Sequence, residues 1–199
     1  MVDRKTIEAY DQRVGEYAAL VAKQNEKSDP ALLCFIEKLK KGDNVLDLGC
    51  GPGHAAHTMK NHGLVVDAVD ASPEMVKLAN ETYDVGARVM LFAELDAVAH
   101  YDGVWANFSL LHAPISEFSD HLAAIRKALK TGGWFHIAMK SGEGEKRDSL
   151  NRLYAYYTRD DLAQRLERAG FEIKDEASGE LRGLTGDLET WIAIDSVAV

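Results

Sequence analysis

The chain has 199 residues, of which 46% are hydrophobic and 28% charged, so we expect one domain over residues 1–199 with a substantial core. Its net charge of −9 excludes the proteins that hold nucleic acid or an anionic membrane through a basic surface. Neither a signal peptide nor an apolar run near the ~20 residues of a membrane span is recognisable. The two cysteines, Cys34 and Cys50, lack the spacing of a zinc site. We expect free thiols in a reduced, cytoplasmic setting, with Cys34 buried.

Two amphipathic helices are predicted before the first strand. Residues 4–22 place apolar side chains three and four positions apart, and residues 30–40 repeat this spacing. We expect both helices, within a covering segment of residues 1–41, to lie across the sheet above a ligand. Tyr10 and Tyr17 lie on the apolar face of the first helix, so each either packs in the core or contacts that ligand.

The stretch from Asn44 to Gly53 is a short apolar strand that breaks at three glycines within five residues. A helical segment follows over residues 55–61. Strand, glycine turn and helix together form a site for a nucleotide-like ligand, because glycines allow close approach and a helix start presents free N–H groups. Asp47 lies two residues before the first glycine. A carboxylate there suits a cationic amine better than a phosphate.

A second buried strand is predicted over residues 64–70, with an acid at its end. Asp70 follows Gly49 by 21 residues, where a carboxylate can accept hydrogen bonds from both hydroxyls of a ribose. Ala71 and Met75 would then lie beside the sugar and the adenine.

Strands and helices alternate through the rest of the chain. Further strands are predicted over residues 87–92, 102–107 and 134–140, and helices from Ser72–Pro73, over residues 116–130 and from the capping residue Thr158 to Gly170. Two closing strands, over residues 171–176 and 189–197, have no helix-length segment between them and should pair as an antiparallel hairpin. This order predicts an α/β fold with a doubly wound, mostly parallel seven-stranded sheet.

The glycine turn with Asp47, followed by Asp70, resembles the first motifs of the class I S-adenosylmethionine (SAM)-dependent methyltransferases. The resemblance extends from about Tyr10 to Val197 and implies a Rossmann-like methyltransferase fold with SAM as cofactor. A closer resemblance, carried by residues 101–112 and 142–148, is to small bacterial methyltransferases of undefined substrate.

The resemblance also implies roles for single residues. Several residues of the glycine turn are expected to hold the methionine end of SAM: Asp47, Gly49, Cys50, Gly51 and Gly53. Asp70 would hold the ribose, Met90 and Leu91 would flank the adenine, and Asn107 would lie next to the sulfonium. Nothing in the sequence calls for a metal.

Residues 141–157 are predicted to form a wall of the acceptor pocket, since a long connection at the carboxyl ends of the strands is often functional. Arg147 and Arg152 would recognise an anionic group, and Tyr154 or Tyr157 would pack on the substrate. The alternative is a surface helix whose tyrosines pack on the sheet.

The expected reaction is in-line methyl transfer to a small-molecule acceptor, in which the protein mainly aligns the reacting atoms. An anionic acceptor needs no base, whereas a neutral hydroxyl or an ammonium does; His112 or a tyrosine such as Tyr157 is then the candidate. A nucleic acid acceptor is not expected, because residues 106–109 lack the Asn-Pro-Pro-aromatic motif of amino-methylating enzymes. The sequence leaves the oligomeric state open.

Two other functions remain open. A nicotinamide-dependent oxidoreductase is disfavoured by Asp47 and by the glycine spacing. A SAM-binding regulatory module without catalysis would carry the same cofactor motifs.

Overall fold

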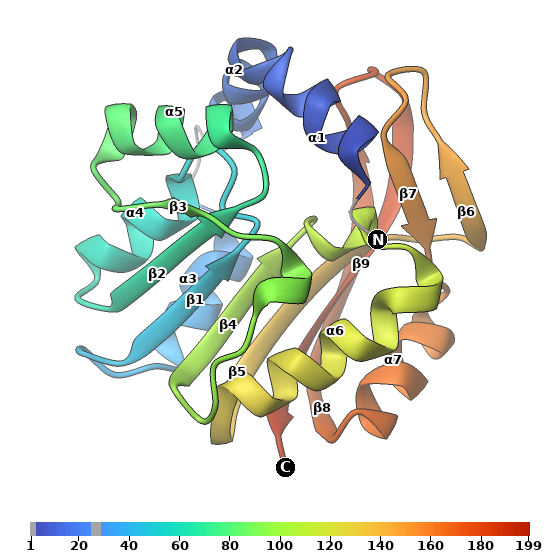
Figure 1. The fold of residues 1–199 in the computed structure, drawn as a ribbon. Coiled ribbons are helices and arrows are strands. Elements are labelled where there is room, and N and C mark those ends of the chain that lie inside the picture. The colour runs from blue at the N-terminus through green and yellow to red at the C-terminus, as the bar shows by residue number, and fades with distance from the viewer. Residues whose placement is uncertain (1–2, 25–28) are drawn as a thin grey trace.

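A computed structural model describes residues 3–24 and 29–199 and contains a seven-stranded sheet of order β3-β2-β1-β4-β5-β9-β8 (Figure 1). Five strands form its parallel part: β1 (Asn44–Leu48), β2 (Val65–Asp70), β3 (Arg88–Val89), β4 (Tyr101–Asn107) and β5 (Leu129–Lys140). The closing hairpin consists of β8 (Phe171–Arg182) and β9 (Leu188–Ala198), and β9 also pairs antiparallel to β5. The predicted fold class is therefore confirmed.

Helices cover both faces of the sheet, as the alternation of side chains along β1 requires. Leu46 and Leu48 face the cluster that includes α6 and α7, whereas Val45 faces the cluster that includes α3 and α4. The helices are α1 (Arg4–Asp11), α2 (Val14–Gln24), α3 (Pro30–Glu37), α4 (His54–Asn61), α5 (Pro73–Tyr83), α6 (Ile115–Ala128) and α7 (Arg159–Arg168), with short 3-10 helices η1 (Phe92–Glu94) and η2 (Leu110–His112). No helix of the described segments is both long and apolar enough to cross a bilayer.

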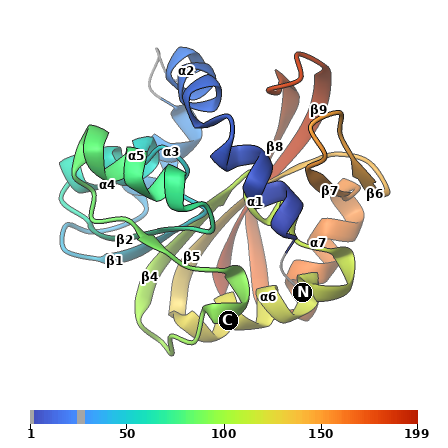
Figure 2. The ribbon, with the colours of Figure 1, turned by 45° about the horizontal axis from the view of Figure 1, so that its top comes forward.

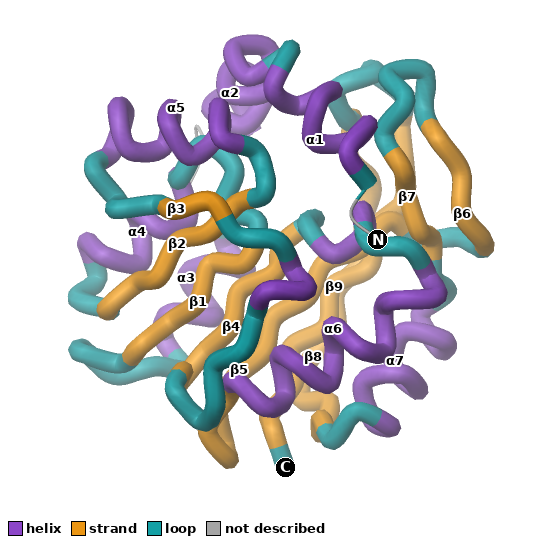
Figure 3. Tube along the Cα trace, viewed as in Figure 1, coloured by secondary structure: helices purple, strands orange, loops and turns teal. Residues whose placement is uncertain are grey.

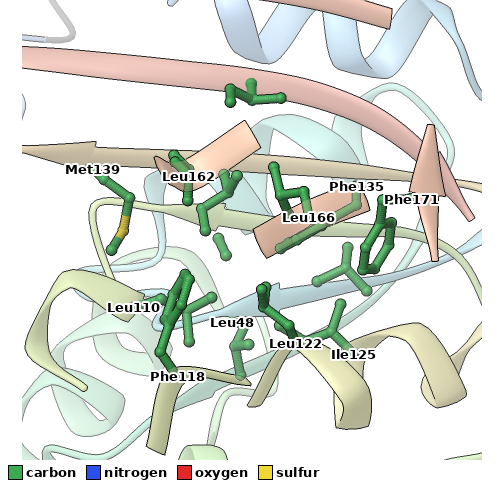
Figure 4. Packing of buried hydrophobic residues seen from close by; sticks show 14 of the residues in the cluster. Leu48, Leu110, Phe118, Leu122, Ile125, Phe135, Met139, Leu162, Leu166 and Phe171 are labelled. Atoms are coloured by element: carbon green, nitrogen blue, oxygen red, sulfur yellow. The ribbon is translucent and has the colours of Figure 1, made fainter. Parts of the chain in front are cut away.

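The largest hydrophobic cluster lies between the sheet and the helices α6 and α7 (Figure 4). Phe118 and Leu122 of α6 and Leu162 and Leu166 of α7 are buried in it. The strand side supplies Phe135, which is fully buried and whose ring lies 5.0 Å from that of Phe171. This cluster joins the parallel strands to the antiparallel hairpin.

The N-terminal segment is two helices rather than the predicted single one. α1 ends at Asp11 and α2 begins at Val14, so the chain turns at residues 12–13. In one continuous helix Tyr10 and Tyr17 would be separated by ~10 Å along the axis. The turn instead brings their ring centroids to 5.1 Å, so that both tyrosines reach one pocket.

Of the predicted covering segment, residues of α1 and α2 line a pocket at the end of the sheet, whereas α3 packs elsewhere. Leu32, Phe35 and Ile36 of α3 pack on a face of the sheet with Val45. Cys34 lies on the opposite side of α3 and is exposed, contrary to the expected burial.

Several boundaries differ from the predicted ones (Figure 3). β3 contains only Arg88–Val89, and α6 ends at Ala128 because the chain already enters β5 at Leu129, which pairs with Tyr101. Residues 141–157 contain neither an open loop nor a helix. They form a separate antiparallel hairpin of β6 (Gly144–Arg147) and β7 (Leu153–Tyr156).

The main cluster should dominate the stability of the fold. Replacing Phe135→Ala removes a fully buried aromatic ring and should lower the free energy of unfolding by about 3–5 kcal/mol in a urea titration. Val89→Ala, at a side chain 51% exposed on β3, is the control and should change it by less than ~0.5 kcal/mol. Equal losses for the two variants would contradict this assignment of the core.

Candidate active site

A pocket lies at the end of the sheet where β1, β2 and β4 finish. Helices α1 and α2 pass over this end of the sheet (Figure 2). Its wall comes from five segments far apart in the sequence: the two N-terminal helices, the glycine turn, the end of β2 with the start of α5, η1, and the chain from β4 to α6. The carboxyl ends of parallel strands are the usual place for ligands in such sheets.

The acid at the end of β2 fixes the glycine turn. The backbone N–H of Gly51 donates to Asp70 Oδ2 and that of Ser72 donates to Oδ1, each at 2.8 Å. The pKa of this carboxyl is raised because it is buried, although these backbone hydrogen bonds oppose the shift. Both Asp70 and Gly51 line the pocket.

The position of Gly49 has no room for a side chain. Its φ is 83°, and a Cβ at this position would lie 2.3 Å from Cβ of Ser109. Since Ser109 follows β4, only glycine lets the turn after β1 lie against the end of β4.

Asp47 is buried just before the turn, with only 2% of its surface exposed. It accepts a hydrogen bond from the backbone N–H of Ala56 at the start of α4, while its Oδ2 atom has no partner among the described residues. Burial, together with the negative charge of Asp70, raises its pKa to about 7. Two acids with raised pKa values therefore lie at this end of the sheet, Asp70 in the pocket wall and Asp47 behind it, an arrangement that a bound cation would stabilise.

On the side of the pocket away from Asp70, a series of hydrogen bonds runs from Arg152 through Tyr10 and His112 to Leu153. Nη1 of Arg152 donates to the Tyr10 hydroxyl (3.1 Å), and that hydroxyl lies 2.8 Å from Nε2 of His112. The other ring nitrogen of His112, Nδ1, lies 2.6 Å from the carbonyl oxygen of Leu153. A carbonyl only accepts, so Nδ1 carries the proton and Nε2 accepts from Tyr10. Burial lowers the pKa of His112 to about 3, so the ring is neutral at physiological pH.

One ion pair joins the N-cap residue of α1 to the β6–β7 hairpin, and a second lies within the hairpin. Arg147 donates from Nη1 and Nη2 to the two oxygens of Asp3, at 2.9 and 2.8 Å. The backbone N–H of Leu153 donates to the Thr6 hydroxyl at 2.8 Å, and that hydroxyl donates in turn to Asp3. Arg152 forms a second pair, with its Nε and Nη2 atoms 2.9 and 2.6 Å from Asp148 Oδ2.

The pocket brings together many, but not all, of the residues predicted from the sequence. Those that line it are Tyr10, Tyr17, Gly49, Gly51, Asp70, Ala71, Met75, Leu91, Asn107 and His112. Those that do not are Asp47, Cys50, Gly53, Met90, Arg147, Arg152, Tyr154 and Tyr157.

Of the two predicted arginines and two predicted tyrosines outside the pocket, Arg147 is exposed, whereas Arg152, Tyr154 and Tyr157 are buried. Each arginine is already paired with an aspartate, as described above. Tyr157 is 1% exposed, and its ring packs 4.6 Å from that of Phe118 in the main core. The Tyr154 ring lies 4.7 Å from His112. The structure thus places Tyr157 in the core and Tyr154 in a second layer.

Other residues of the wall were not identified from the sequence. Phe108 and Ser109 line the pocket because the chain turns sharply after β4, where Phe108 has a φ of +54°. A phenylalanine rarely adopts this conformation, so nothing in the sequence signals the turn. Asp3 and Thr6 also line the pocket. Their partners are more than 140 residues away in the chain.

A family model described as a methyltransferase domain matches residues 20–176. An uncharacterized methyltransferase of Staphylococcus carnosus is 26% identical over 145 residues, which are 70% of this chain and 70% of that protein. A ubiquinone biosynthesis O-methyltransferase of Hydrogenovibrio crunogenus is 30% identical over 152 residues. The match covers 72% of this chain but 56% of that relative, so the chain spans little more than half of its length.

A similar fold is found in the 1,6-didemethyltoxoflavin-N1-methyltransferase of Burkholderia thailandensis. That structure contains bound 1,6-didemethyltoxoflavin and S-adenosylhomocysteine (SAH). It superposes with a TM-score of 0.73 and 25% sequence identity, covering 97% of this chain and 88% of that one.

Burial of Asp47 should be visible in the pH dependence of stability. Its folded pKa of about 7 lies above the ~4 of an unfolded aspartate, so the folded state binds the proton more tightly. Ionising Asp47 therefore destabilises the ligand-free protein progressively from pH ~4 to ~7. We expect Asp47→Asn to lose less unfolding free energy than the wild type between pH 4 and pH 8 in urea titrations.

Asp67→Asn on β2 is the control, because the sign is opposite there. Although partial burial opposes the shift, hydrogen bonds from Arg88 and Tyr101 lower the pKa of Asp67. Asp67 stabilises the fold above the unfolded pKa, and this contribution is lost as the pH falls through the lowered one. Asp67→Asn should therefore lower the free energy of unfolding, relative to the wild type, by more at pH 8 than at low pH. Parallel pH curves for wild type and Asp47→Asn would contradict the assignment.

Proposed function

We propose that this chain, which belongs to the class I SAM-dependent methyltransferases, transfers the methyl group of SAM to a small-molecule acceptor in the pocket beneath α1. Family membership rests on the match of the methyltransferase domain over residues 20–176. The observation that carries the proposal for the site is the Asp70 carboxylate, which two backbone N–H groups hold at the pocket wall beside the glycine turn.

The residues of the pocket fit SAM. The cofactor carries an ammonium and a sulfonium, and two acids near the ends of β1 and β2 have raised pKa values: half-buried Asp70 in the pocket wall and buried Asp47 behind it. The unpartnered Oδ2 atom of Asp47 gives its charge no compensation within the described protein. A cationic ligand supplies that compensation, whereas the pyrophosphate of a dinucleotide would add repulsion.

The proposed contacts follow the order of the strands. Asp70 would accept hydrogen bonds from the ribose hydroxyls, as acids at the end of this strand do in nucleotide-binding folds. Ala71, Met75 and Leu91 line the pocket on the β2–β3 side and would surround the adenine. Gly49 and Gly51 would lie against the methionine end.

Asn107 and Tyr17 complete the proposed cofactor site. Asn107 ends β4 and lines the pocket, at the point where the wall passes from the glycine turn to His112. The Tyr17 ring lies over Gly51: a Cβ added to that glycine would be 3.6 Å from the ring. When bound, SAM supplies an activated methyl group; the chain binds it, orients it and excludes water from it by the cover of α1 and α2.

We also propose that residues 1–199 form one domain and that the protein is cytoplasmic. The first proposal is supported by the core, in which Phe171 of the closing hairpin packs on Phe135 of the parallel sheet. The second is supported by two free cysteines, Cys34 and Cys50.

Ligand binding separates this proposal from the two alternative functions. We expect SAM and SAH to raise the melting temperature, and NAD to leave it unchanged. Stabilisation by NAD alone would indicate a nicotinamide-dependent oxidoreductase. Stabilisation by SAM and SAH, without methyl transfer to any acceptor of a broad panel, would favour a regulatory SAM-binding module.

Asp70→Asn should weaken SAH binding by about 10- to 100-fold, because charge-assisted hydrogen bonds contribute about 1.5–3 kcal/mol. Isothermal titration calorimetry measures this directly. Asp67→Asn is the matched control, since it changes an acid to an amide on the same strand, at a side chain paired with Arg88. Its SAH affinity should stay within about twofold. An equal loss in both variants would point to a general effect on the fold.

A further inference from the structure

We propose that the acceptor is a neutral, flat nitrogen heteroaromatic molecule that attacks through an unprotonated ring nitrogen. This inference rests on the proposed function and specifies its substrate class. It follows from three properties of the pocket side beyond β4, here called the acceptor wall: Ile7, Tyr10, Phe108, His112, Ala113 and Pro114.

The acceptor wall is assigned from the strand order. β1, β2 and β3 lie on one side of β4 and carry the proposed cofactor contacts, whereas β5 lies on the other side. The chain after β4 and helix α1 supply the acceptor wall on that second side. A molecule bound there lies next to Asn107, close to the proposed position of the reacting methyl group.

The first property is the absence of a cation to receive an anionic acceptor. Among the described residues that line the pocket there is no lysine and no arginine. The nearest guanidinium groups already have carboxylate partners, Arg147 with Asp3 and Arg152 with Asp148. Burying an anion without a compensating charge is costly, so a carboxylate or phosphate acceptor is disfavoured.

The second property is the absence of a base to activate a neutral hydroxyl or an ammonium. Both ring nitrogens of His112 are engaged, Nε2 with the Tyr10 hydroxyl and Nδ1 with the Leu153 carbonyl. Burial first, and then the positive charges of Arg152 and Lys140, lower the pKa of His112, so its neutral ring takes up a proton poorly. Burial also raises the pKa of Tyr10, which therefore keeps its proton.

Acidic side chains in the pocket do not replace His112 as a base. Asp3 accepts hydrogen bonds from both terminal nitrogens of Arg147 and from Thr6, and these bonds lower its pKa although burial opposes the shift. Glu117 and His121 of α6 also line the pocket, 3.9 Å apart, and the His121 ring lies 5.7 Å from that of Phe92 in η1. Both therefore lie on the η1 side of the pocket and not on the acceptor wall. The acceptor must therefore bring a free electron pair of its own.

The third property is the shape and polarity of the acceptor wall. Tyr10 and His112 present aromatic rings whose centroids are 5.3 Å apart, with Phe108, Ile7 and Pro114 completing a mostly apolar surface. Because the polar atoms of Tyr10 and His112 bond to each other, the wall presents rings rather than hydrogen-bonding groups. Flat, weakly polar molecules suit such a surface.

The transfer then balances without a proton. The lone pair of the ring nitrogen forms the new N–C bond, and the C–S bond breaks with its electrons on sulfur. The positive charge passes from sulfur to the ring, and no proton leaves the acceptor. An alkylamine differs because it is protonated near neutral pH, as the ~10.4 pKa of a lysine illustrates.

The test uses two-ring probes that share one shape: isoquinoline, quinoline and quinoxaline against 2-naphthol and 2-naphthoate. Calorimetry with the SAH-saturated protein gives binding, and mass spectrometry with SAM gives the methylated product. We expect the heteroaromatic probes to bind and to be N-methylated, 2-naphthol to remain unmethylated, and 2-naphthoate to bind at least about tenfold more weakly.

The inference is overturned if no heteroaromatic probe binds the SAH-saturated protein, or if only 2-naphthol or 2-naphthoate is methylated. Loss of SAM and SAH binding itself is a different result, since it would refute the proposed function and not only the acceptor class.

A variant tests the missing base with the probe that is methylated fastest. Tyr10→Phe removes the hydroxyl that bonds to His112, and kcat should fall by less than about tenfold, with any larger effect on KM. A relay through Tyr10 and His112 predicts instead a loss of about 100-fold or more. Tyr83→Phe on α5, outside the pocket-lining residues, is the control.

The pH profile of kcat distinguishes the same two cases. We expect kcat to be constant between pH 6 and 9. The charged and titratable groups that act on Tyr10 and His112 are Arg152, Asp148, Lys140, Tyr154 and Asp70. A rise in kcat with pH that disappears in Tyr10→Phe would overturn the inference.

Discussion

The hydrogen bonds from Gly51 and Ser72 to Asp70 are the interaction on which the site depends, because they join three elements at one point. Gly51 belongs to the turn after β1, and Ser72 caps α5 through its hydroxyl, which accepts from the Met75 N–H. The same hydroxyl donates to Asp11 at the end of α1. A single carboxylate therefore fixes the glycine turn, the start of α5 and, through Ser72, the helix that covers the pocket.

The other side of the cover is bonded to the β6–β7 hairpin. Arg147 pairs with Asp3, the N-cap residue of α1, and Arg152 donates to the hydroxyl of Tyr10. These bonds link segments more than 140 residues apart. Asp3 also neutralises Arg147, while Arg152 is neutralised by Asp148 within the hairpin. On the proposed acceptor site, these two ion pairs leave neither arginine free to pair with an anionic acceptor.

Sequence reasoning succeeded where the cause of a structure is local. The glycine turn, the acid at Asp70 and the cap at Ser72 each follow from neighbours within a few residues, so pattern and spacing were sufficient to predict their positions. It failed where the cause is distant. Arg147 was interpreted as free to bind a substrate anion because its partner, Asp3, lies near the other end of the chain. The break after α1 and the left-handed Phe108 are likewise set by tertiary contacts.

The two sides of the pocket differ in charge: one has two acids without a cationic partner among the described residues, and the other has its nearby arginines paired with carboxylates. This difference affects which form of the cofactor the site binds more tightly. Near β1 and β2, Asp47 and Asp70 are buried close enough for the charge of one to raise the pKa of the other. On the proposed function, a ligand with a net positive charge relieves that repulsion more than a neutral zwitterion. SAM and SAH share an ammonium and a carboxylate, and only SAM adds the positive sulfonium. The acid pair should therefore bind SAM more tightly than SAH. The residues that define the acceptor wall carry no unpaired charge and should not distinguish the two.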